Sequence, residues 1–268
     1  MIDLGKKNLL GVLLDAVDYE SAAARILSAG RRRVPLSVTA LAVHGVMLGV
    51  QDPAFRYRLN HLDLVLPDGQ PVRWGLNILH QASLPDRVYG PALTLQVCEK
   101  AAEESLSIYL YGSRVEVLKA LSTNLQRKFP GLIIAGQSPS LFRPASSVEK
   151  EAIIGRILES GSAITLVGLG CPRQEVWVYE ITPHIHQPAL AVGAAFEFHA
   201  GLRPQAPRWM QNAGLEWLFR LSKEPGRLWK RYLFLNPWYL ALLSLQELGL
   251  VCFNPQDAVA PKDHMIYA

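Results

Sequence analysis

The sequence predicts an α/β protein in which a doubly wound parallel sheet is followed by a C-terminal helical appendage. Apolar runs of strand length alternate with helical patterns as far as about residue 200. Several runs are apolar at every position, which is typical of strands covered on both faces. Beyond Gly201 no strand pattern is evident, and four prolines divide the chain into short helices. We therefore expect a core over residues 1–200, a helical appendage over 201–253 and a flexible tail over 254–268.

Seven segments have the length and the apolar character of strands. They are residues 9–14, 36–39, 64–66, 107–111, 132–135, 164–167 and 189–192. Helical patterns lie between them, so crossover helices are expected to join these strands into one parallel sheet.

Capping residues mark several helix ends. Asp52 followed by Pro53 predicts an N-cap with proline at the first helical position. Ser146, with Glu149 three residues later, predicts a capping box. Gly30 follows an alanine-rich stretch and precedes three arginines, which predicts a helix C-terminus at that glycine.

Composition excludes several classes of protein. Half of the residues are apolar and under a fifth are charged, which is wrong for a disordered chain. The three cysteines are far apart and form no Cys-x-x-Cys, which argues for a reducing compartment and against a structural zinc site. The N-terminus lacks the pattern of a signal peptide, and the best candidate membrane span, residues 232–253, is interrupted by polar residues and proline. A cytoplasmic protein, soluble or peripherally attached to a membrane, is expected.

Positive charge is concentrated in the appendage. Between Gly201 and Arg231 there are seven Lys or Arg and two Glu, whereas the whole chain has a net charge of only +4. Four of the six tryptophans, at positions 209, 217, 229 and 238, lie in or just beyond this segment. Arginine and tryptophan together suit a polyanion near an interface, such as a diphosphate, a nucleic acid or an anionic membrane surface. The alternative is a set of amphipathic helices with solvated charges.

Polar residues follow three of the predicted strands. Thr39 closes one strand, Asp68 with Gly69 follows the next, and residues 168–175 follow a later one and open a helix. Ligands of open α/β sheets bind beyond the carboxyl ends of the strands, and a helix N-terminus suits an anion. The glycines of residues 168–175 match neither the dinucleotide-binding motif nor the P-loop.

Each of these residues also has a purely structural interpretation. Asp68 and Gly69 together are typical of a simple turn. Thr39 can cap a helix, and Arg87 can form an ion pair on the surface. The histidines show no convincing ligand spacing, and Asp-x-Asp, a common metal-chelating signature of nucleotide-sugar enzymes, is absent. No metal site is predicted.

Taken together and in order, the polar clusters resemble the WecG/TagA/CpsF family of bacterial glycosyltransferases. The matching segments are residues 38–40, 66–71, 86–90, 167–175, 192–197, 206–210 and 216–221, with Glu224, Pro225 and Arg227. The resemblance covers roughly residues 34 to 235 and implies a Rossmann-like core. It also implies an inverting transfer of a sugar from a UDP-sugar to a saccharide linked to a polyprenyl diphosphate, at the cytoplasmic face of the membrane. The donor sugars in view are N-acetylmannosamine, its uronic acid and glucuronic acid.

The resemblance also implies roles for individual residues. Asp68 is the general base that takes the proton from the acceptor hydroxyl, and Thr39 orients a substrate beside it. The substrate-binding residues implied are Arg87, Gly90, Gly168, Gly170, Gln174, Glu175, Arg220, Arg227 and Arg231. No metal and no cofactor is expected, so arginines and helix N-termini would stabilise the leaving UDP. The resemblance further implies that the appendage is a lid that rests against an anionic membrane surface. We also expect the protein to associate into a homo-oligomer through the core. Nucleic acid is not expected as a partner.

Three positions depart from the family pattern. Leu41 stands where asparagine is usual, Gln205 where arginine is usual, and Glu197 where aspartate is common. These departures leave open a second hypothesis, an inactive relative that binds a nucleotide sugar and recruits assembly partners. A nicotinamide-dependent oxidoreductase, suggested only by the sheet and Gly168-Leu169-Gly170, lacks the third glycine of the usual motif.

Overall fold

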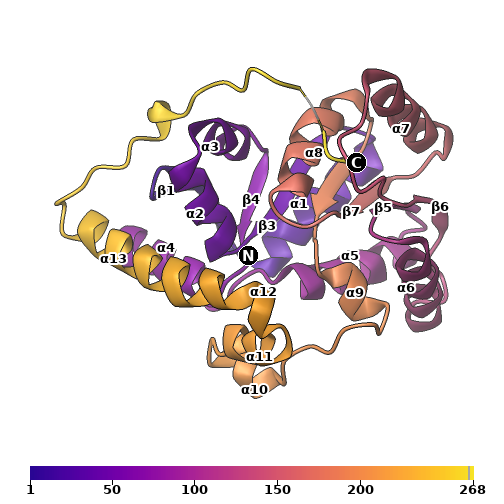
Figure 1. Ribbon diagram of the computed structural model, residues 1–268. Coiled ribbons are helices and arrows are strands. Elements are labelled where there is room, and N and C mark those ends of the chain that lie inside the picture. Colours follow the sequence, from indigo (N-terminus) through magenta and orange to yellow (C-terminus); the bar gives the residue numbers. More distant parts are fainter. Residues whose placement is uncertain (265) are drawn as a thin grey trace.

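A six-stranded parallel sheet forms the centre of the molecule (Figure 1). The computed structural model describes residues 1–264 and 266–268, without the side chains of Arg227, Lys230 and Arg231. The sheet has the order β4-β3-β8-β7-β5-β6. Its strands are β3 (Leu36–Leu41), β4 (Leu64–Pro67), β5 (Ile108–Gly112), β6 (Ile134–Ser138), β7 (Ile164–Gly168) and β8 (Pro188–Ala191). All adjacent strands are parallel, so the predicted Rossmann-like sheet is confirmed.

Helices cover both faces of the sheet, as the continuous apolarity of its strands predicts. One face packs against α2 (Val43–Gln51), α3 (Pro53–Asn60), α4 (Gln70–His80), α7 (Ser147–Glu159) and α8 (Arg173–Ile181). The other face packs against α1 (Tyr19–Arg32), α5 (Gly90–Glu103), α6 (Val115–Lys128) and α9 (Ala195–His199). Each face therefore has its own hydrophobic core.

The strand predicted over residues 9–14 is wrong. The chain instead forms an antiparallel hairpin of β1 (Asp3–Leu9) and β2 (Val12–Val17). Leu10 and Gly11 make the turn with φ of 54° and 83°, the positive values that a two-residue hairpin loop of type I′ requires. The sequence predicts a single strand here because the residues on both sides of this turn are apolar and buried.

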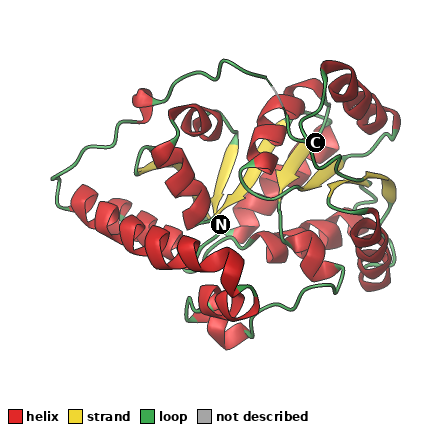
Figure 2. Cartoon of the chain, viewed as in Figure 1, coloured by secondary structure: helices red, strands yellow, loops and turns green. Residues whose placement is uncertain are grey.

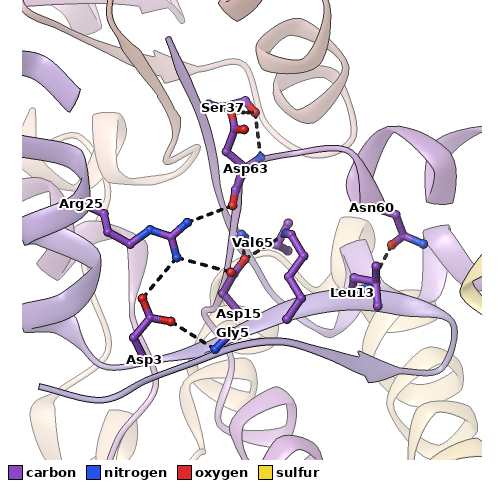
Figure 3. A network of polar contacts seen from close by, with 10 residues as sticks. Asp3, Gly5, Leu13, Asp15, Arg25, Ser37, Asn60, Asp63 and Val65 are labelled. Carbon is purple, nitrogen blue, oxygen red and sulfur yellow. Dashed lines mark hydrogen bonds and ion pairs between the residues drawn. The ribbon is translucent and has the colours of Figure 1, made fainter. Parts of the chain in front are cut away.

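A polar network attaches this hairpin to the edge of the main sheet (Figure 3). The Asp15 carboxylate on β2 is buried and accepts hydrogen bonds from the Val65 backbone N–H (2.7 Å) and the Lys6 Nζ (3.1 Å). Arg25 lies 3.6 Å from the other oxygen of the Asp15 carboxylate. Val65 belongs to β4, the edge strand, so the hairpin satisfies a backbone donor that the sheet leaves unpaired.

Two of the three predicted helix ends are confirmed. The Asp52 carboxylate accepts from two backbone N–H groups in the first turn of α3. Ser146 and Glu149 form the complete capping box of α7. Gly30 is not a C-cap, because α1 continues to Arg32 and ends at Arg33, which has φ of 54°.

Gly30 has a packing role instead. A Cβ atom at this position would lie 3.1 Å from the Ile164 side chain and 3.2 Å from the Ala163 carbonyl oxygen. The glycine therefore allows α1 to approach the start of β7 closely, a reason that the local sequence does not reveal.

The segment after Gly201 forms short helices, as its prolines predict. These are α10 (Arg208–Asn212), α11 (Glu216–Lys223), α12 (Pro225–Lys230), the π-helical turn η2 (Arg231–Leu235) and α13 (Asn236–Glu247). Figure 1 shows α10 and α11 outside the core, whereas α13 lies along α4. Tyr239 of α13 is buried, its hydroxyl donates to the Pro71 carbonyl (2.9 Å), and Gln246 accepts from the Leu10 N–H (2.9 Å). The last helix is thus integrated into the core.

The described residues after α13, 248–264 and 266–268, form a long loop that contains the short turn η3 (Pro255–Asp257), passes α3 and ends near α7 and α8 (Figure 2). The end of this predicted flexible tail makes defined contacts. Ile266 and Ala268 are buried, and Ser140 Oγ donates to the Ala268 carbonyl at 2.8 Å. Among the described helices, none has both the length and the apolar character needed to cross a bilayer.

Candidate active site

A cavity of about 410 Å³ opens at the carboxyl ends of the central strands and is closed on one side by α11. Seven of the residues implied by the family resemblance line it: Asp68, Arg87, Gly168, Gly170, Gln174, Glu175 and Arg220. Thr39 and Gly90 do not line the cavity, but each contacts a residue that does. The side chains of Arg227 and Arg231 lie outside the described part of the structure, so their predicted role stays a prediction.

Asp68 stands directly after β4 and lines the cavity. Its backbone N–H donates to the Leu41 carbonyl (3.2 Å), and its Oδ1 accepts from the Gly90 N–H (3.0 Å). Burial raises the pKa of Asp68 to about 6, and the Glu216 carboxylate acts in the same direction. Arg87, the Gly90 N–H and Arg220 lower this pKa but do not outweigh the burial. A carboxylate of this kind suits proton abstraction near neutral pH.

Arg87 lies beside Asp68 and is held by the appendage. Its Nη2 donates to Glu216 Oε2 on α11 at 2.7 Å, and both side chains are buried. The Tyr89 hydroxyl donates to the other oxygen of Glu216 (3.1 Å), and the Arg87 guanidinium lies 4.2 Å from the centre of the Tyr89 ring. Arg87 is therefore a buried ion pair rather than the surface pair considered from the sequence.

Arg220, one turn further along α11, lines the same cavity. It lies near enough to Asp68 to lower the pKa of that carboxyl. Its Nε is buried and has no hydrogen-bond partner among the described residues. A guanidinium with an unused buried donor in a cavity is suited to bind a phosphate oxygen.

The loop after β7 is organised around Gln174 and Glu175. Glu175 is fully buried, and its Oε1 accepts from Thr39 Oγ1 and from Gln174 Nε2, both at 3.0 Å. The Gln174 Oε1 accepts from the Gly170 N–H at 3.1 Å. Burial raises the pKa of Glu175. Thr39 and Gln174 thus share one oxygen of Glu175, and Glu175 and Gly170 together fix the orientation of the Gln174 amide.

Steric constraints explain why glycine occupies positions 168 and 170 of this loop. A Cβ at Gly168 would lie 2.5 Å from the Phe196 ring, and Gly170 adopts φ of +80°. The neighbouring Gly112, at the end of β5, has φ of +104° and would place a Cβ 2.9 Å from the Gly168 backbone. Gly112 therefore allows β5 to approach β7 closely, Gly168 leaves room for the Phe196 ring, and Gly170 adopts a backbone conformation that favours glycine.

The sequence alone assigns no individual role to several residues of the cavity. They are Ser113, Ser140, Phe142, Arg173 and Arg203, together with Tyr89 and Glu216. Trp217 and Tyr232 of the basic, aromatic segment also line the cavity. Tyr89, Arg173 and Glu216 stand inside segments that match the family, and this is the signal that could have identified them. Ser113, Ser140 and Phe142 lie in loops after β5 and β6 that carry no local pattern. Arg203 is ion-paired with Glu197 and with Glu224, each at 3.1 Å.

Two of the departures from the family pattern, Leu41 and Glu197, fit the surrounding structure. Leu41 is buried at the end of β3, and its side chain fills the space beside Gly45, where a Cβ would lie 2.3 Å from it. Glu197 retains a carboxylate, which pairs with Arg203. In the described part of the chain, no group of three or more His, Cys, Asp or Glu side chains is arranged to hold a metal ion.

Comparison with known proteins gives consistent matches. The family model described as "Glycosyl transferase WecG/TagA/CpsF family" matches residues 7–251. A protein of Bacillus spizizenii, named N-acetylglucosaminyldiphosphoundecaprenol N-acetyl-beta-D-mannosaminyltransferase, is 28% identical over 197 residues, which are 73% of this chain and 74% of the relative. A Bacillus subtilis protein of the same name is 28% identical over 208 residues, 77% of each chain.

Proposed function

The chain belongs to the WecG/TagA/CpsF family of glycosyltransferases, and from this membership we propose that it transfers a sugar from a UDP-sugar to a saccharide linked to a polyprenyl diphosphate. Both relatives are named for transfer of an N-acetylmannosaminyl group to N-acetylglucosaminyl-diphosphoundecaprenol. We propose a donor of the same class: N-acetylmannosamine, its uronic acid or glucuronic acid. The observation that carries the proposal is the placement of Asp68, with its raised pKa, in one cavity with Arg220 and the Gln174 loop.

In the proposed reaction Asp68 is the general base. The acceptor hydroxyl attacks the anomeric carbon of the donor from the face opposite to the leaving UDP, so the anomeric configuration inverts. The hydroxyl proton passes to Asp68 as the new glycosidic bond forms and the bond to the UDP oxygen breaks. The Gly90 N–H holds Oδ1 of the carboxylate, which leaves Oδ2 for the proton.

The leaving diphosphate needs stabilisation as its charge develops. We propose that Arg220 and the N-terminus of α8, at the end of the glycine loop, supply it without a divalent cation. Arg227 and Arg231 remain further candidates from the family resemblance alone. Gln174, fixed by Gly170 and Glu175, would contact the nucleotide.

The proposed place of action is the cytoplasmic face of the membrane that holds the acceptor lipid. The appendage exposes large apolar side chains near the cavity, among them Trp229, Leu233 and Phe234. Aromatic and apolar side chains beside a basic segment are suited to an anionic interface. Association into a homo-oligomer through the core also stays a prediction.

A turnover assay tests this function directly. Full-length protein would be incubated with labelled UDP-sugars of the proposed class and a short-chain polyprenyl-diphosphate N-acetylglucosamine acceptor, with and without EDTA. We expect labelled product in both conditions, and loss of the activity with EDTA would reject the metal-independent mechanism. UDP binding by calorimetry without turnover of any donor would instead favour the inactive relative considered from the sequence.

Asp68→Asn tests the base assignment. The amide cannot accept the hydroxyl proton, so turnover should fall by about 10²- to 10⁴-fold, the usual contribution of general-base catalysis. UDP affinity should stay within a few-fold of wild type, because Asp68 is assigned to the acceptor. Full turnover by this variant would show that another group is the base.

A further inference from the structure

The contacts of Glu216 join the appendage to the residues around Asp68. Glu216 is in the first turn of α11, whereas Arg87 and Tyr89 precede α5 in the core. Both carboxylate oxygens are used, one by Arg87 Nη2 at 2.7 Å and the other by the Tyr89 hydroxyl at 3.1 Å. Glu216 and Arg87 are buried, so this ion pair is shielded from solvent.

The same contacts determine which carboxylate the Arg87 guanidinium binds. Arg87 is close enough to Asp68 to act on its carboxylate electrostatically. Yet among the described residues no hydrogen bond or ion pair joins the two side chains, and the guanidinium is stacked on Tyr89 and bonded to Glu216. A carboxylate bonded directly to arginine is a much weaker base than one that is not, because the cation stabilises its charged form.

We propose that Glu216 is a positioning residue that keeps Arg87 from a direct hydrogen bond to Asp68, so that the docking of α11 controls how basic the Asp68 carboxylate is. The inference rests on the proposed function, in which Asp68 is the base. When α11 is in place, the guanidinium is bonded to Glu216, and the Asp68 carboxylate is kept for the acceptor proton. Without Glu216, Arg87 is expected to turn to Asp68, the other carboxylate that acts on its charge.

Other charged or titratable groups also face this site. Arg220 lies on α11 together with Glu216, Tyr19 is on α1, Tyr89 and Asp86 flank Arg87, and the cavity further includes His44, Arg173, Glu175, Glu197 and Arg203. All of them remain in Glu216→Gln and Glu224→Gln. Because loss of the Glu216 charge by itself lowers the pKa of Asp68, Tyr89→Phe, which keeps every charge in place, reports on the Glu216 contacts alone.

The first measurement is the titration of Asp68 in the full-length protein. Carbon-13 NMR of the Asp68 carboxyl, assigned with the Asp68→Asn variant, would be recorded for wild type, Glu216→Gln and the control Glu224→Gln. Glu224 is a second appendage glutamate, ion-paired with Arg203 at 3.1 Å. Glu216→Gln should lower the titration midpoint by at least about one pH unit, since an arginine in contact lowers a carboxyl pKa by roughly 1–3 units. Glu224→Gln should leave the midpoint within a few tenths.

Kinetics supply the second measurement. The acid limb of kcat against pH should move to lower pH in Glu216→Gln, and kcat at pH 8 should fall roughly three- to tenfold, because a less basic carboxylate is a weaker catalyst. Tyr89→Phe, which removes one donor to Glu216 and leaves the charges unchanged, should shift the midpoint in the same direction by less. It serves as the decisive variant if Glu216→Gln does not fold.

The outcomes separate this inference from the proposed function. An unchanged or higher Asp68 midpoint in a folded Glu216→Gln or Tyr89→Phe protein overturns the inference. So does an unchanged kcat with a lower KM for the donor, which would mean that Glu216 merely competes with a substrate phosphate for Arg87. If wild type turns over no donor, the proposed function fails, whereas the titration still decides whether Glu216 keeps Arg87 off Asp68.

Discussion

The protonation state of Asp68 determines the expected pH dependence of the proposed reaction. Its pKa lies at about 6, raised from 3.8 chiefly by burial. A general base acts only when deprotonated, so kcat/KM should rise as the pH rises through about 6 and level off above pH 7. Rates measured from pH 4.5 to 8 with a short-chain acceptor would check this. An acid limb near pH 4 would show that Asp68 titrates as an ordinary carboxyl or is not the base.

The same raised pKa predicts a stability effect. In the folded protein the charged form of Asp68 is disfavoured relative to the unfolded chain, so ionisation destabilises the fold as the pH rises from about 4 to 6. Asp68→Asn should therefore increase the free energy of unfolding by about 1–2 kcal/mol at pH 7.5 and by little at pH 4. Urea unfolding at both pH values tests this, and a variant less stable than wild type at pH 7.5 would contradict it.

Arg220 is predicted to bind the donor diphosphate. Arg220→Gln should weaken UDP binding by about tenfold or more, because a charge-assisted hydrogen bond is worth roughly 1.5–3 kcal/mol. Calorimetric titration with UDP measures the change. Arg208→Gln, an exposed arginine of α10 outside the cavity, is the matched control for net charge. Equal losses in both variants would assign the effect to general electrostatic attraction.

Individual site residues were partly predictable from the sequence. Asp68, Gln174 and Arg220 could be identified because each stands in a recognisable segment, and the structure places all three in one cavity. The pairing of Glu216 with Arg87 could not be predicted, since the two residues are 129 positions apart and have no local periodicity in common.

At the scale of elements, the hairpin of β1 and β2 depends on Asp15. Removing this carboxylate leaves the Val65 N–H without its partner, and a buried unpaired donor costs about 1–3 kcal/mol. Asp15→Ala should lower the free energy of unfolding by that amount in urea titrations. Asp3→Ala, which removes a more exposed partner of Arg25, should cost less than about 0.5 kcal/mol. Similar losses in the two variants would contradict the special role of Asp15.

The main strands were predictable because burial on both faces leaves a continuous apolar signal. Five of the six strands of the sheet overlap their predicted segments almost fully, whereas β6 is shifted by about two residues toward its C-terminus. The hairpin was missed because its turn, Leu10-Gly11, is buried and lacks the usual polar turn residues. Helix ends with side-chain caps were predictable, and the end of α1, where the constraint is packing of Gly30 on β7, was not.

For the whole molecule, the position of the appendage predicts membrane binding. Leu233 and Phe234 in η2 are more than half exposed and lie next to Tyr232, which lines the cavity. Replacing both by serine should reduce pelleting with anionic vesicles at least about fivefold, because two apolar anchors are lost. Val148→Ser, at an apolar residue of α7 that is even more exposed, should leave pelleting unchanged. Unchanged pelleting of the double variant would remove this surface as the membrane contact.

Helix α13 belongs both to the appendage and to the core. Tyr239 and Leu243 of α13 are part of the core beside α4, so a truncation at Gly201 would uncover apolar surface as well as remove Arg220. Point substitutions on the exposed residues therefore separate a role in binding from a role in folding better than a truncation does.

By itself the sequence determined the class of fold and, through the order of its segments, the family. Both depend on local signals: continuous apolarity, capping residues and short motifs. Only the tertiary structure decided that Thr39 bonds to Glu175, and that Glu216 reaches from the appendage to Arg87 beside Asp68. These two contacts join residues more than a hundred positions apart. Burial, charge pairing and the pKa of Asp68 follow from such distant contacts, so no local pattern encodes them.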